Sequence, residues 1–478
     1  MMLAGILVTL YFVMLLAFGP WAAKKMNTGS TSDFILAGRN VPLIIVIGGI
    51  IATLINSATI LGYAGSGYSL GISAYFSAMG WMIALTWMGF WFIPRLRKAN
   101  ITTIPELFEK YFGLPHRVVT VVLVACRDMG VTAGTVIGMA VVFQGLFDIT
   151  LNMALVITLA VTLIFTTLGG MWAVMITDAL QAALILVGTL ILVPLAIAYI
   201  GGWESFIDKI PTTHISMTNA GFSQSTAWII MAFLTALGYQ TLIQRGLSAK
   251  SEKVAKKGFL YGGIIATFWY MVPFLIGTIA FVIFPGIDPE ESFTKVASLF
   301  GKIGSILFSI VILASCISTL SSTVLTTASN ISLDIYQRII NKNASGKELV
   351  IVTRISIVMV ALLGTFIAKS LPYILELMLV GGRIMAASLT PVLLAIVFWK
   401  PSRTAYISSF LAMVAGSLVI VITLLTGSGQ SEGVVMLWKI DPMLIGLPVT
   451  LLVLIIGTII ENKFKQEPEN INIVKESL

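Results

Sequence analysis

Long apolar stretches, each about the length needed to cross a bilayer, follow one another along almost the whole chain. A spanning helix needs about 20 apolar residues. Here 58% of the 478 residues are hydrophobic and only 10% are charged, against about 25% charged in an ordinary globular domain. This pattern excludes soluble enzymes, nucleic-acid-binding proteins and disordered proteins, and it predicts an all-α protein that crosses the membrane many times.

We predict 13 transmembrane spans separated by short loops. They are numbered in chain order and run over 3–23, 42–66, 73–94, 118–147, 150–168, 173–200, 225–244, 258–285, 303–335, 350–369, 372–398, 405–426 and 441–460. The first span begins without a positive charge and is followed by Lys24 and Lys25, which is typical of an uncleaved helix. Residues 1–460 are expected to form one transporter domain, followed by a short cytoplasmic tail over 461–478.

The basic residues of the loops predict which side each loop faces. Of the 29 Lys and Arg residues, 22 fall in alternate loops and in the tail, and 5 fall in the loops between them. Cytoplasmic loops carry the excess of Lys and Arg in multi-pass proteins. The split predicts a plasma-membrane protein with its N-terminus outside and its C-terminus inside.

Spans 2 and 7 are interrupted by polar residues and glycine. Span 2 carries Asn56, Ser57 and Thr59 near its centre, and span 7 carries Gly238 within the polar run 235–241. Interrupted helices five spans apart indicate an inverted repeat, with 42–200 as one half and 225–398 as the other. The first helix and inner loop (1–41) and two C-terminal helices (405–460) would flank the repeat. Ordinary packing of small residues between helices is the alternative.

Span 9 carries three polar residues on one helix face. Ser315, Ser318 and Thr319 have the i, i+3, i+4 spacing that brings side chains together. Their oxygens, with carbonyls from an interrupted span, suit a small hard cation. The alternative is that these hydroxyls bond back to their own helix.

Two arginines lie near the middle of spans 4 and 11, at about the depth of Ala52 and Ser315. A central arginine costs about 2.5–3.5 kcal/mol on insertion scales, so Arg127 and Arg383 should face protein or water. Because guanidinium groups suit carboxylates, they favour an anionic substrate. The alternatives are structural ion pairs, of Arg127 with Asp128 and of Arg383 with Glu376.

Asp178 lies near the predicted inner end of span 6. It could guide a cation towards the cytoplasm, or it could be a favourable helix-start charge. The two histidines, His116 and His214, are far apart and no nucleotide-binding loop is present, so neither an enzyme nor an ATP-driven pump is indicated.

Four stretches of the sequence resemble the sodium:solute symporter family, which includes carriers of proline, galactose, sialic acid, pantothenate and monocarboxylates. The first inner loop resembles the family's F-x-x-A-G-R block, and residues 169–181 its G-G-x-x-A-V-x-x-T-D-x-x-Q signature. Residues 244–251 are similar to its Q-R-x-L-A-A-K-S loop, and span 9 matches from Ser318 to Tyr336. Together the four matches are specific for the family and nearly silent on the substrate.

The resemblance implies a LeuT-type fold and a sodium site. The implied ion ligands are the backbone carbonyls of Ala52, Ile55 and Ser315 and the hydroxyls of Ser318 and Thr319. The resemblance also places Asp178 beside the ion's inner exit path, or at a second sodium ion.

At the substrate positions this chain departs from the sugar and proline carriers. The glutamine, asparagine and gating tyrosine of a galactose carrier align with Thr59, Ala232 and Thr235, and its second glutamine aligns with Arg383. The aspartate of a proline carrier aligns with Leu54. Arg127 resembles the arginine with which a sialic acid carrier binds a carboxylate.

The sequence therefore predicts a sodium-coupled symporter for uptake of a small carboxylate by alternating access. The predicted solute contacts are Thr59, Arg127, Thr235 and Arg383. A carrier of amino acids or neutral solutes, or a proton-coupled carrier that titrates Asp178, is the alternative. The expected partners are the solute, Na+ and the lipid bilayer, with no nucleic acid and with a monomer sufficient for transport.

Overall fold

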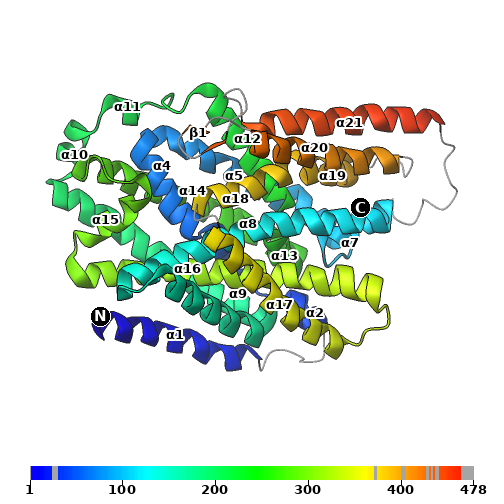
Figure 1. The fold of residues 1–478 in the computed structure, drawn as a ribbon, viewed down its shortest axis with the longest axis horizontal. Helices are drawn as coiled ribbons and strands as arrows, with labels where there is room; N and C mark the ends of the chain where they lie inside the picture. The colour runs from blue at the N-terminus through cyan, green and yellow to red at the C-terminus, as the bar shows by residue number, and fades with distance from the viewer. Residues whose placement is uncertain are drawn as a thin grey trace.

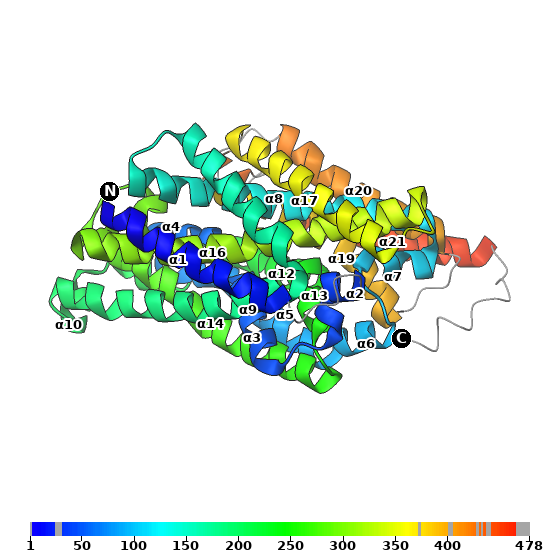
Figure 2. The ribbon, with the colours of Figure 1, turned by 90° about the horizontal axis from the view of Figure 1, so that it is seen from below.

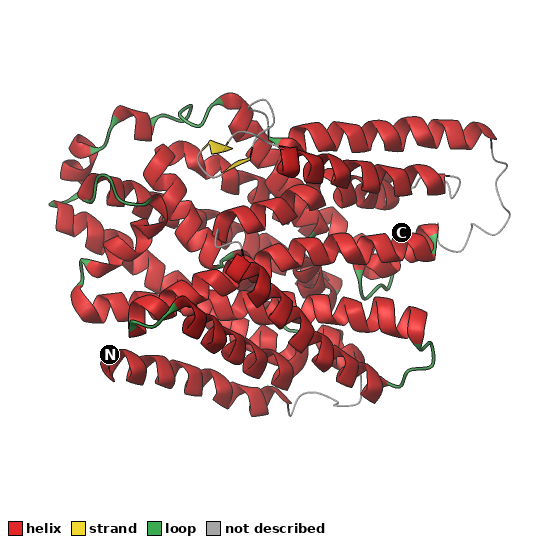
Figure 3. Cartoon of the chain, in the orientation of Figure 1, coloured by secondary structure: helices red, strands yellow, loops and turns green. Residues whose placement is uncertain are grey.

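The computed structural model describes residues 2–23, 31–370, 374–399, 405–426, 430–431, 434–435 and 441–464. Lys24, Lys25 and most of the predicted tail lie outside these residues. Helices make up nearly all of the described chain, and one short antiparallel pair of strands, β1 (Gln430–Ser431) and β2 (Val434–Val435), is visible in Figure 3. The all-α, multi-pass architecture is confirmed.

Each predicted span coincides with helix. Spans 1 to 6 correspond to α1 (Met2–Ala23), to α3 (Leu43–Leu54) with η2 (Ala58–Gly62) and α4 (Tyr63–Leu70), to α5 (Phe76–Trp87) with η4 (Met88–Phe92) and α6 (Ile93–Lys98), to α8 (Leu114–Phe147), and to the two halves of α9 (Leu151–Ile200). Spans 7 to 10 correspond to α12 (Phe222–Gly238) with α13 (Gln240–Ser248), to α14 (Glu252–Ile283), to α16 (Gly301–Asn330) with η6 (Ile331–Ile340), and to α17 (Gly346–Ser370). Spans 11 to 13 correspond to α18 (Ile374–Ile384) with η7 (Met385–Leu389), α19 (Thr390–Leu394) and η8 (Ala395–Trp399), to α20 (Tyr406–Thr426), and to α21 (Pro442–Phe464).

Short helices occupy the connections. They are α2 (Thr31–Leu36), η1 (Ala37–Arg39), η3 (Gly71–Tyr75), α7 (Ile104–Phe112), α10 (Trp203–Lys209), α11 (Thr212–Ile215), η5 (Pro289–Glu291) and α15 (Ser292–Ser298). Figures 1 and 2 show α10 at the end of the bundle where the chain begins, and Figure 1 shows α11 and α15 there too, with α7 towards the other end. The loop charges predict that the end with α10 faces the outside and that the end with α7 faces the cytoplasm.

Length and composition alone identify fewer spans than the 13 predicted. Nine helices in the described chain are long and apolar enough to cross a membrane, or ten if α12 and α13, bent by 50° at their junction, count as one. Three apolar helices are shorter, at Met2–Leu15, Leu43–Leu54 and Leu151–Thr167. The difference arises largely because span 2 is broken after Leu54 and because α9 changes direction.

The change of direction in α9 occurs at Gly170, which has φ 51° and ψ −164°. A Cβ atom there would lie 2.9 Å from a ring carbon of Phe34 and 3.0 Å from its carbonyl oxygen. Glycine is required both by the backbone conformation and by this close approach. It separates spans 5 and 6 within one continuous stretch of helix.

Burial distinguishes central helices from peripheral ones. The most apolar windows of spans 4, 9 and 11 are 72%, 78% and 89% buried, whereas those of spans 6 and 13 are 22% and 28% buried. Since lipid covers exposed helices, we expect a polar site to lie among the more buried ones, which include spans 4, 9 and 11.

Candidate ion and solute site

The break in span 2 lies against the polar face of span 9. Helix α3 ends at Leu54, and Ile55 has extended backbone angles (φ −100°, ψ 101°). The hydroxyl of Ser318 is 3.4 Å from the carbonyl oxygen of Ala52 and 3.0 Å from that of Ser315. Three of the predicted sodium ligands therefore lie together, although Ala52 and Ser318 are 266 residues apart in the sequence.

The remaining two predicted ligands are buried as well. Thr319 is fully buried, and its hydroxyl has no hydrogen-bond partner in the described chain. Ile55 is fully buried at the break itself. A buried hydroxyl without a partner is costly, and backbone carbonyls with hydroxyl oxygens are the ligands that hard cations take.

Asp178 is joined to the same region by a buried arginine. Its Oδ2 accepts a hydrogen bond from Arg245 at 2.7 Å and one from Ser322 at 3.2 Å. Arg245 also donates to the hydroxyl of Thr53, the residue after Ala52, at 3.2 Å. Asp178 Oδ1 is buried and has no partner among the described residues, so one carboxylate oxygen remains available to a cation.

Arg127 is held between an acid and an aromatic ring. Its guanidinium donates to Asp128 at 3.2 Å, and its Cζ lies 3.2 Å from the centre of the Tyr239 ring, at the junction of α12 and α13. Asp128 in turn accepts a hydrogen bond from Thr327 of α16 at 3.3 Å. The pair with Asp128 that the sequence left open is therefore formed, and it ties span 4 to the break of span 7 and to span 9.

Two glycines of α18 bring spans 4, 7 and 11 together. A Cβ atom at Gly381 would lie 2.8 Å from the Cα of Arg127. The carbonyl of Gly382 accepts a hydrogen bond from the Thr235 hydroxyl at 3.1 Å. Thr235 and Arg127 are thus placed around one segment of span 11.

Arg383, the next residue, engages a different partner. Its Nε and Nη2 atoms lie 3.2–3.3 Å from the carboxylate oxygens of Asp441, which directly precedes α21. Both side chains are almost completely buried. The arginine's Nη1 has no partner in the described chain. The side chain of Glu376, its candidate partner from the sequence, lies outside the described side chains.

Thr59 uses its hydroxyl within its own span. The oxygen accepts the Asn56 N–H at 2.8 Å and lies 2.9 Å from the Asn56 carbonyl. Of the four predicted solute contacts, Arg127 and Thr235 therefore flank the break of span 7, Thr59 stabilises the break of span 2, and Arg383 is bonded to Asp441.

Sequence reasoning missed Asp441, Arg245 and Tyr239 as members of this region, and it named Asn56 only as part of the break in span 2. Charge balance is the signal that could have indicated the missed acid. Four arginines and four aspartates are buried in the described chain, and each arginine has an aspartate partner. The pairs are Arg117–Asp334, Arg127–Asp128, Arg245–Asp178 and Arg383–Asp441. Because an unpaired charge in this environment is costly, the two arginines inside spans already required acids nearby.

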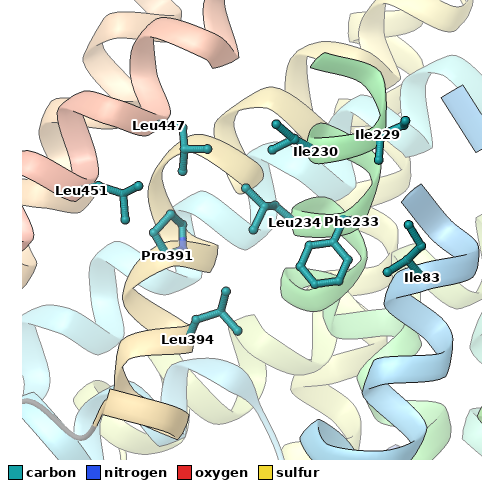
Figure 4. Close-up of a pocket in the computed structure, with 9 residues that line it drawn as sticks. All are labelled: Ile83, Ile229, Ile230, Phe233, Leu234, Pro391, Leu394, Leu447 and Leu451. Atoms are coloured by element: carbon teal, nitrogen blue, oxygen red, sulfur yellow. The ribbon is translucent and has the colours of Figure 1, made fainter. Parts of the chain in front are cut away.

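A cavity of about 520 Å³ lies outside this region (Figure 4). Its lining is entirely apolar and comes from α5, α12, α19 and α21, in the residues Ile83, Ile229, Ile230, Phe233, Leu234, Pro391, Leu394, Leu447 and Leu451. None of the predicted site residues lines it, and it offers no side-chain polar group for an ion or a carboxylate.

Comparisons with known proteins place the chain among membrane transporters. The model of the sodium:solute symporter family matches residues 34–416. The chain is 27% identical to the sodium/glucose cotransporter 4 of Danio rerio over 407 residues, which cover 74% of this chain but only 61% of the relative's length. It is also 27% identical to the osmoregulated proline transporter OpuE of Bacillus subtilis over 445 residues, covering 89% of both chains.

The fold agrees with a solved transporter structure. A Na+-coupled sialic acid symporter, caught in a substrate-bound outward-open state, superposes with a TM-score of 0.81 at 18% identity, over 98% of this chain and 99% of that one. This likeness shows a LeuT-type fold. The match to the family model confirms the resemblance seen in the four motifs. The matched family also agrees with the expectation that the chain is not an enzyme. On this evidence the chain belongs to the sodium:solute symporter family.

Proposed function

We propose that the chain is a sodium-coupled symporter that takes up a small organic solute carrying one carboxylate, by alternating access. The observation that carries the ion part is the oxygen cluster at the break of span 2, where Ser318 meets the carbonyls of Ala52 and Ser315. Family membership supports sodium as the ion. Loop charges support a plasma-membrane location with the N-terminus outside and the C-terminus inside.

Sodium would bind to the carbonyls of Ala52, Ile55 and Ser315 and to the hydroxyls of Ser318 and Thr319. It would fix the broken part of span 2 against span 9 and thereby raise the affinity for solute. Such coupling free energies are typically about 1–3 kcal/mol, and because coupling is reciprocal the solute must tighten sodium binding equally. Movement of spans 2, 3, 7 and 8 against the others would then expose the site to the other side.

The substitution pair Ser318→Ala and Thr319→Ala tests the ion site. We expect the doubly substituted protein to lose sodium-dependent uptake, since two of five ligands are removed. Ser329→Ala is the matched control, because that serine is buried in the same helix and bonds its own backbone at Leu325. Unchanged sodium dependence in the double variant would rule out this site.

The solute part rests on Arg127. Nη1 of its guanidinium is bonded to Asp128 and its face is covered by Tyr239, and an arginine fork has further donors for a carboxylate. Thr235 would contact the solute beside it, while Thr59 and Arg383, both committed to other bonds, would shape the site. We expect a monocarboxylate to raise the melting temperature of the purified protein in sodium but not in potassium. Stabilisation by neutral sugars alone would contradict the assignment.

An amino acid is the second candidate, and Asp128 favours it. An acid directly beside Arg127 provides partners for both charges of a zwitterion, and a proline transporter is among the relatives. The same thermal assay distinguishes the candidates. An amino acid that stabilises the protein, together with an N-acetyl derivative that does not, would show that the ammonium group is recognised.

Asp178 would serve the ion on its way to the cytoplasm. Arg245 donates hydrogen bonds to both the Asp178 carboxylate and the hydroxyl of Thr53, which is the residue after Ala52. The other oxygen of that carboxylate has no partner among the described residues. A second sodium ion there, or a proton in place of sodium, would use the same oxygen. Proton coupling predicts uptake driven by a pH gradient in the absence of sodium, which separates it from the sodium-coupled proposal.

The remaining features are proposed from the same pattern. The two broken spans support repeat halves over 42–200 and 225–398, with the helices of 1–41 and 405–460 flanking them. A single chain contains every residue assigned above, which supports a monomer in the bilayer as the transporting unit.

A further inference from the structure

We infer that Asn56 and Thr59 are positioning residues of the sodium site, which hold the carbonyls of Ala52 and Ile55 free to bind the ion. The inference rests on the proposed sodium site but assigns these two residues a task of their own. Neither is an ion ligand. Together they keep span 2 broken at the point where its carbonyls are needed.

The two residues bond each other reciprocally. Thr59 Oγ1 accepts the backbone N–H of Asn56 at 2.8 Å, and Asn56 Oδ1 accepts the backbone N–H of Thr59 at 3.0 Å. This is the arrangement of a capping box, in which two residues three apart satisfy each other's backbone donors at a helix start. Here it begins the helix that continues through η2 into α4. Both side chains are buried, with 4% and 8% exposure.

The consequence for the ion site follows from helix geometry. In a continuous α-helix the N–H of Asn56 would bond the carbonyl of Ala52, and the N–H of Thr59 would bond that of Ile55. Both donors are instead used by the capping box. The two carbonyls released are the same two that the family resemblance assigns to sodium.

The other contacts of the break satisfy the carbonyl of Leu54 better than that of Ala52. The carbonyl of Leu54 accepts the Tyr270 hydroxyl at 3.2 Å and lies 3.3 Å from the Thr59 hydroxyl. Among the described residues, the carbonyl of Ala52 has only the Ser318 hydroxyl near it, at 3.4 Å, which is beyond the usual range for an O–H···O bond. A poorly paired carbonyl buried among helices is costly, so an ion that binds it gains that energy.

Substitution at Thr59 tests the inference. Thr59→Val keeps the shape but removes the oxygen, so the N–H of Asn56 can return to Ala52 and compete with sodium. We expect the sodium concentration for half-maximal thermal stabilisation, measured without solute, to rise roughly 3- to 30-fold, by analogy with lost helix caps. Thr59→Ser keeps both bonds and should retain the original value within about twofold by the same reasoning.

Asn56→Ala provides a second, independent variant. It should raise the half-saturating sodium concentration in the same way, and the combination with Thr59→Val should add little, because the two residues form one unit. The melting temperature of each variant in potassium verifies that it is folded. A variant that fails this check is replaced by the other, so that a sodium titration is always obtained.

Two outcomes overturn the inference. If Thr59→Val leaves sodium affinity unchanged but weakens solute affinity at saturating sodium, Thr59 is a solute contact. If Thr59→Ser fails to retain sodium affinity, the methyl group rather than the hydroxyl matters. Failure of the proposed function looks different, since Ser318→Ala with Thr319→Ala would then leave sodium binding intact. If the Ser318→Ala and Thr319→Ala protein loses sodium binding while Thr59→Val keeps its sodium affinity, only the capping role is refuted.

Discussion

At the residue scale, Arg383 shows how a buried charge is retained inside a membrane protein. Its guanidinium is paired with Asp441 across 58 residues of sequence, and Asp441 Oδ1 also accepts the Met443 N–H at 2.9 Å at the start of α21. Removing one partner leaves the other charge buried alone, which costs about 3–5 kcal/mol, whereas removing both costs much less.

We therefore expect Asp441→Asn and Arg383→Gln each to lower the melting temperature, and the double variant to be more stable than either single one. Thermal unfolding in detergent, read by intrinsic fluorescence, measures this. Asp208→Asn, at an exposed acid of α10, serves as control and should be neutral. Equal losses that simply add in the double variant would show that the pair is not coupled.

Tyr239 is the residue on which the geometry of Arg127 depends. Its ring lies under the guanidinium at the break of span 7, and a desolvated cation–π contact is worth up to about 2 kcal/mol. Tyr239→Leu should weaken carboxylate binding by roughly 3- to 30-fold and the binding of the corresponding amide by less, whereas Tyr239→Phe should match the wild type. Solute titrations followed by thermal shift measure both ratios. An effect of Tyr239→Phe as large as that of Tyr239→Leu would mean that the hydroxyl is the important group.

For single residues, the sequence predicts which side chains form the site better than it predicts which residues those side chains contact. The spacing of Ser318 and Thr319 was sufficient to place them on one face, because helical periodicity is local. The partner of Arg383 could not be predicted, since Asp441 is brought to it only by the packing of α21 against span 11. The role of Thr59 was hidden for a different reason: a threonine in a broken span can face either the solute or its own backbone.

At the element scale, α7 joins two spans that alternating access would move relative to one another. The N–H of Ile104 donates to Gln240 of α13 at 2.8 Å, and the hydroxyl of Thr103 donates to Asp334 of η6 at 2.9 Å. Glu109, further along α7, pairs with Arg117 and Arg338. Helix α7 therefore bridges the inner half of span 7 and the end of span 9.

The charge of Glu109 makes this bridge sensitive to acid. Burial acts to raise the pKa of Glu109, but hydrogen bonds and charges of Arg117 and Arg338 hold it below its ordinary value of 4.5. A lowered pKa stabilises the docked α7 at pH values above 4.5, and that stabilisation is lost as the pH falls through the lowered pKa. Amide protection factors in α7 should thus be constant from neutral pH to about 5 and fall below about 4.5. Hydrogen exchange checks this, with Glu109→Gln expected to remove the step and Glu204→Gln in α10 to leave it unchanged.

Helix α7 is one of the short connecting helices that the sequence analysis does not predict. Its amphipathic, partly charged sequence lies between two spans and gives no signal in a hydropathy profile. The spans themselves were predictable because a run of about 20 apolar residues has few other structures available to it. Their breaks are predictable only where glycine or clustered polar residues mark them, as at Gly238 and Asn56. The bend at Gly170 lies in the predicted loop between spans 5 and 6, so the sequence separates the two spans there without predicting that the helix continues through the bend.

At the scale of the whole molecule, the buried charges balance. In the described part of the chain, the only buried acidic and basic side chains apart from the two histidines are four arginines and four aspartates, and they are paired one to one. Every buried carboxylate in the described chain is therefore already neutralised by an arginine, so a second sodium ion at the unpartnered Oδ1 of Asp178 would add a net positive charge to this core. One sodium ion and one monocarboxylate would add no net charge to this core.

This balance predicts how uptake responds to voltage. A transported net charge is worth about 2.3 kcal/mol per 100 mV, or roughly a 50-fold change in accumulation. In proteoliposomes with a potassium–valinomycin potential of about 100 mV, negative inside, sodium-driven uptake of a monocarboxylate should therefore change by less than about twofold if one sodium ion accompanies it. A strong increase would mean that a second sodium ion is carried, with the unpartnered oxygen of Asp178 as its expected ligand, and Asp178→Asn should then return the uptake to voltage independence. If a zwitterionic amino acid is the solute, the same potential should raise accumulation with a single sodium ion and with Asp178 in either form, so the two experiments together determine both the charge of the solute and the number of ions.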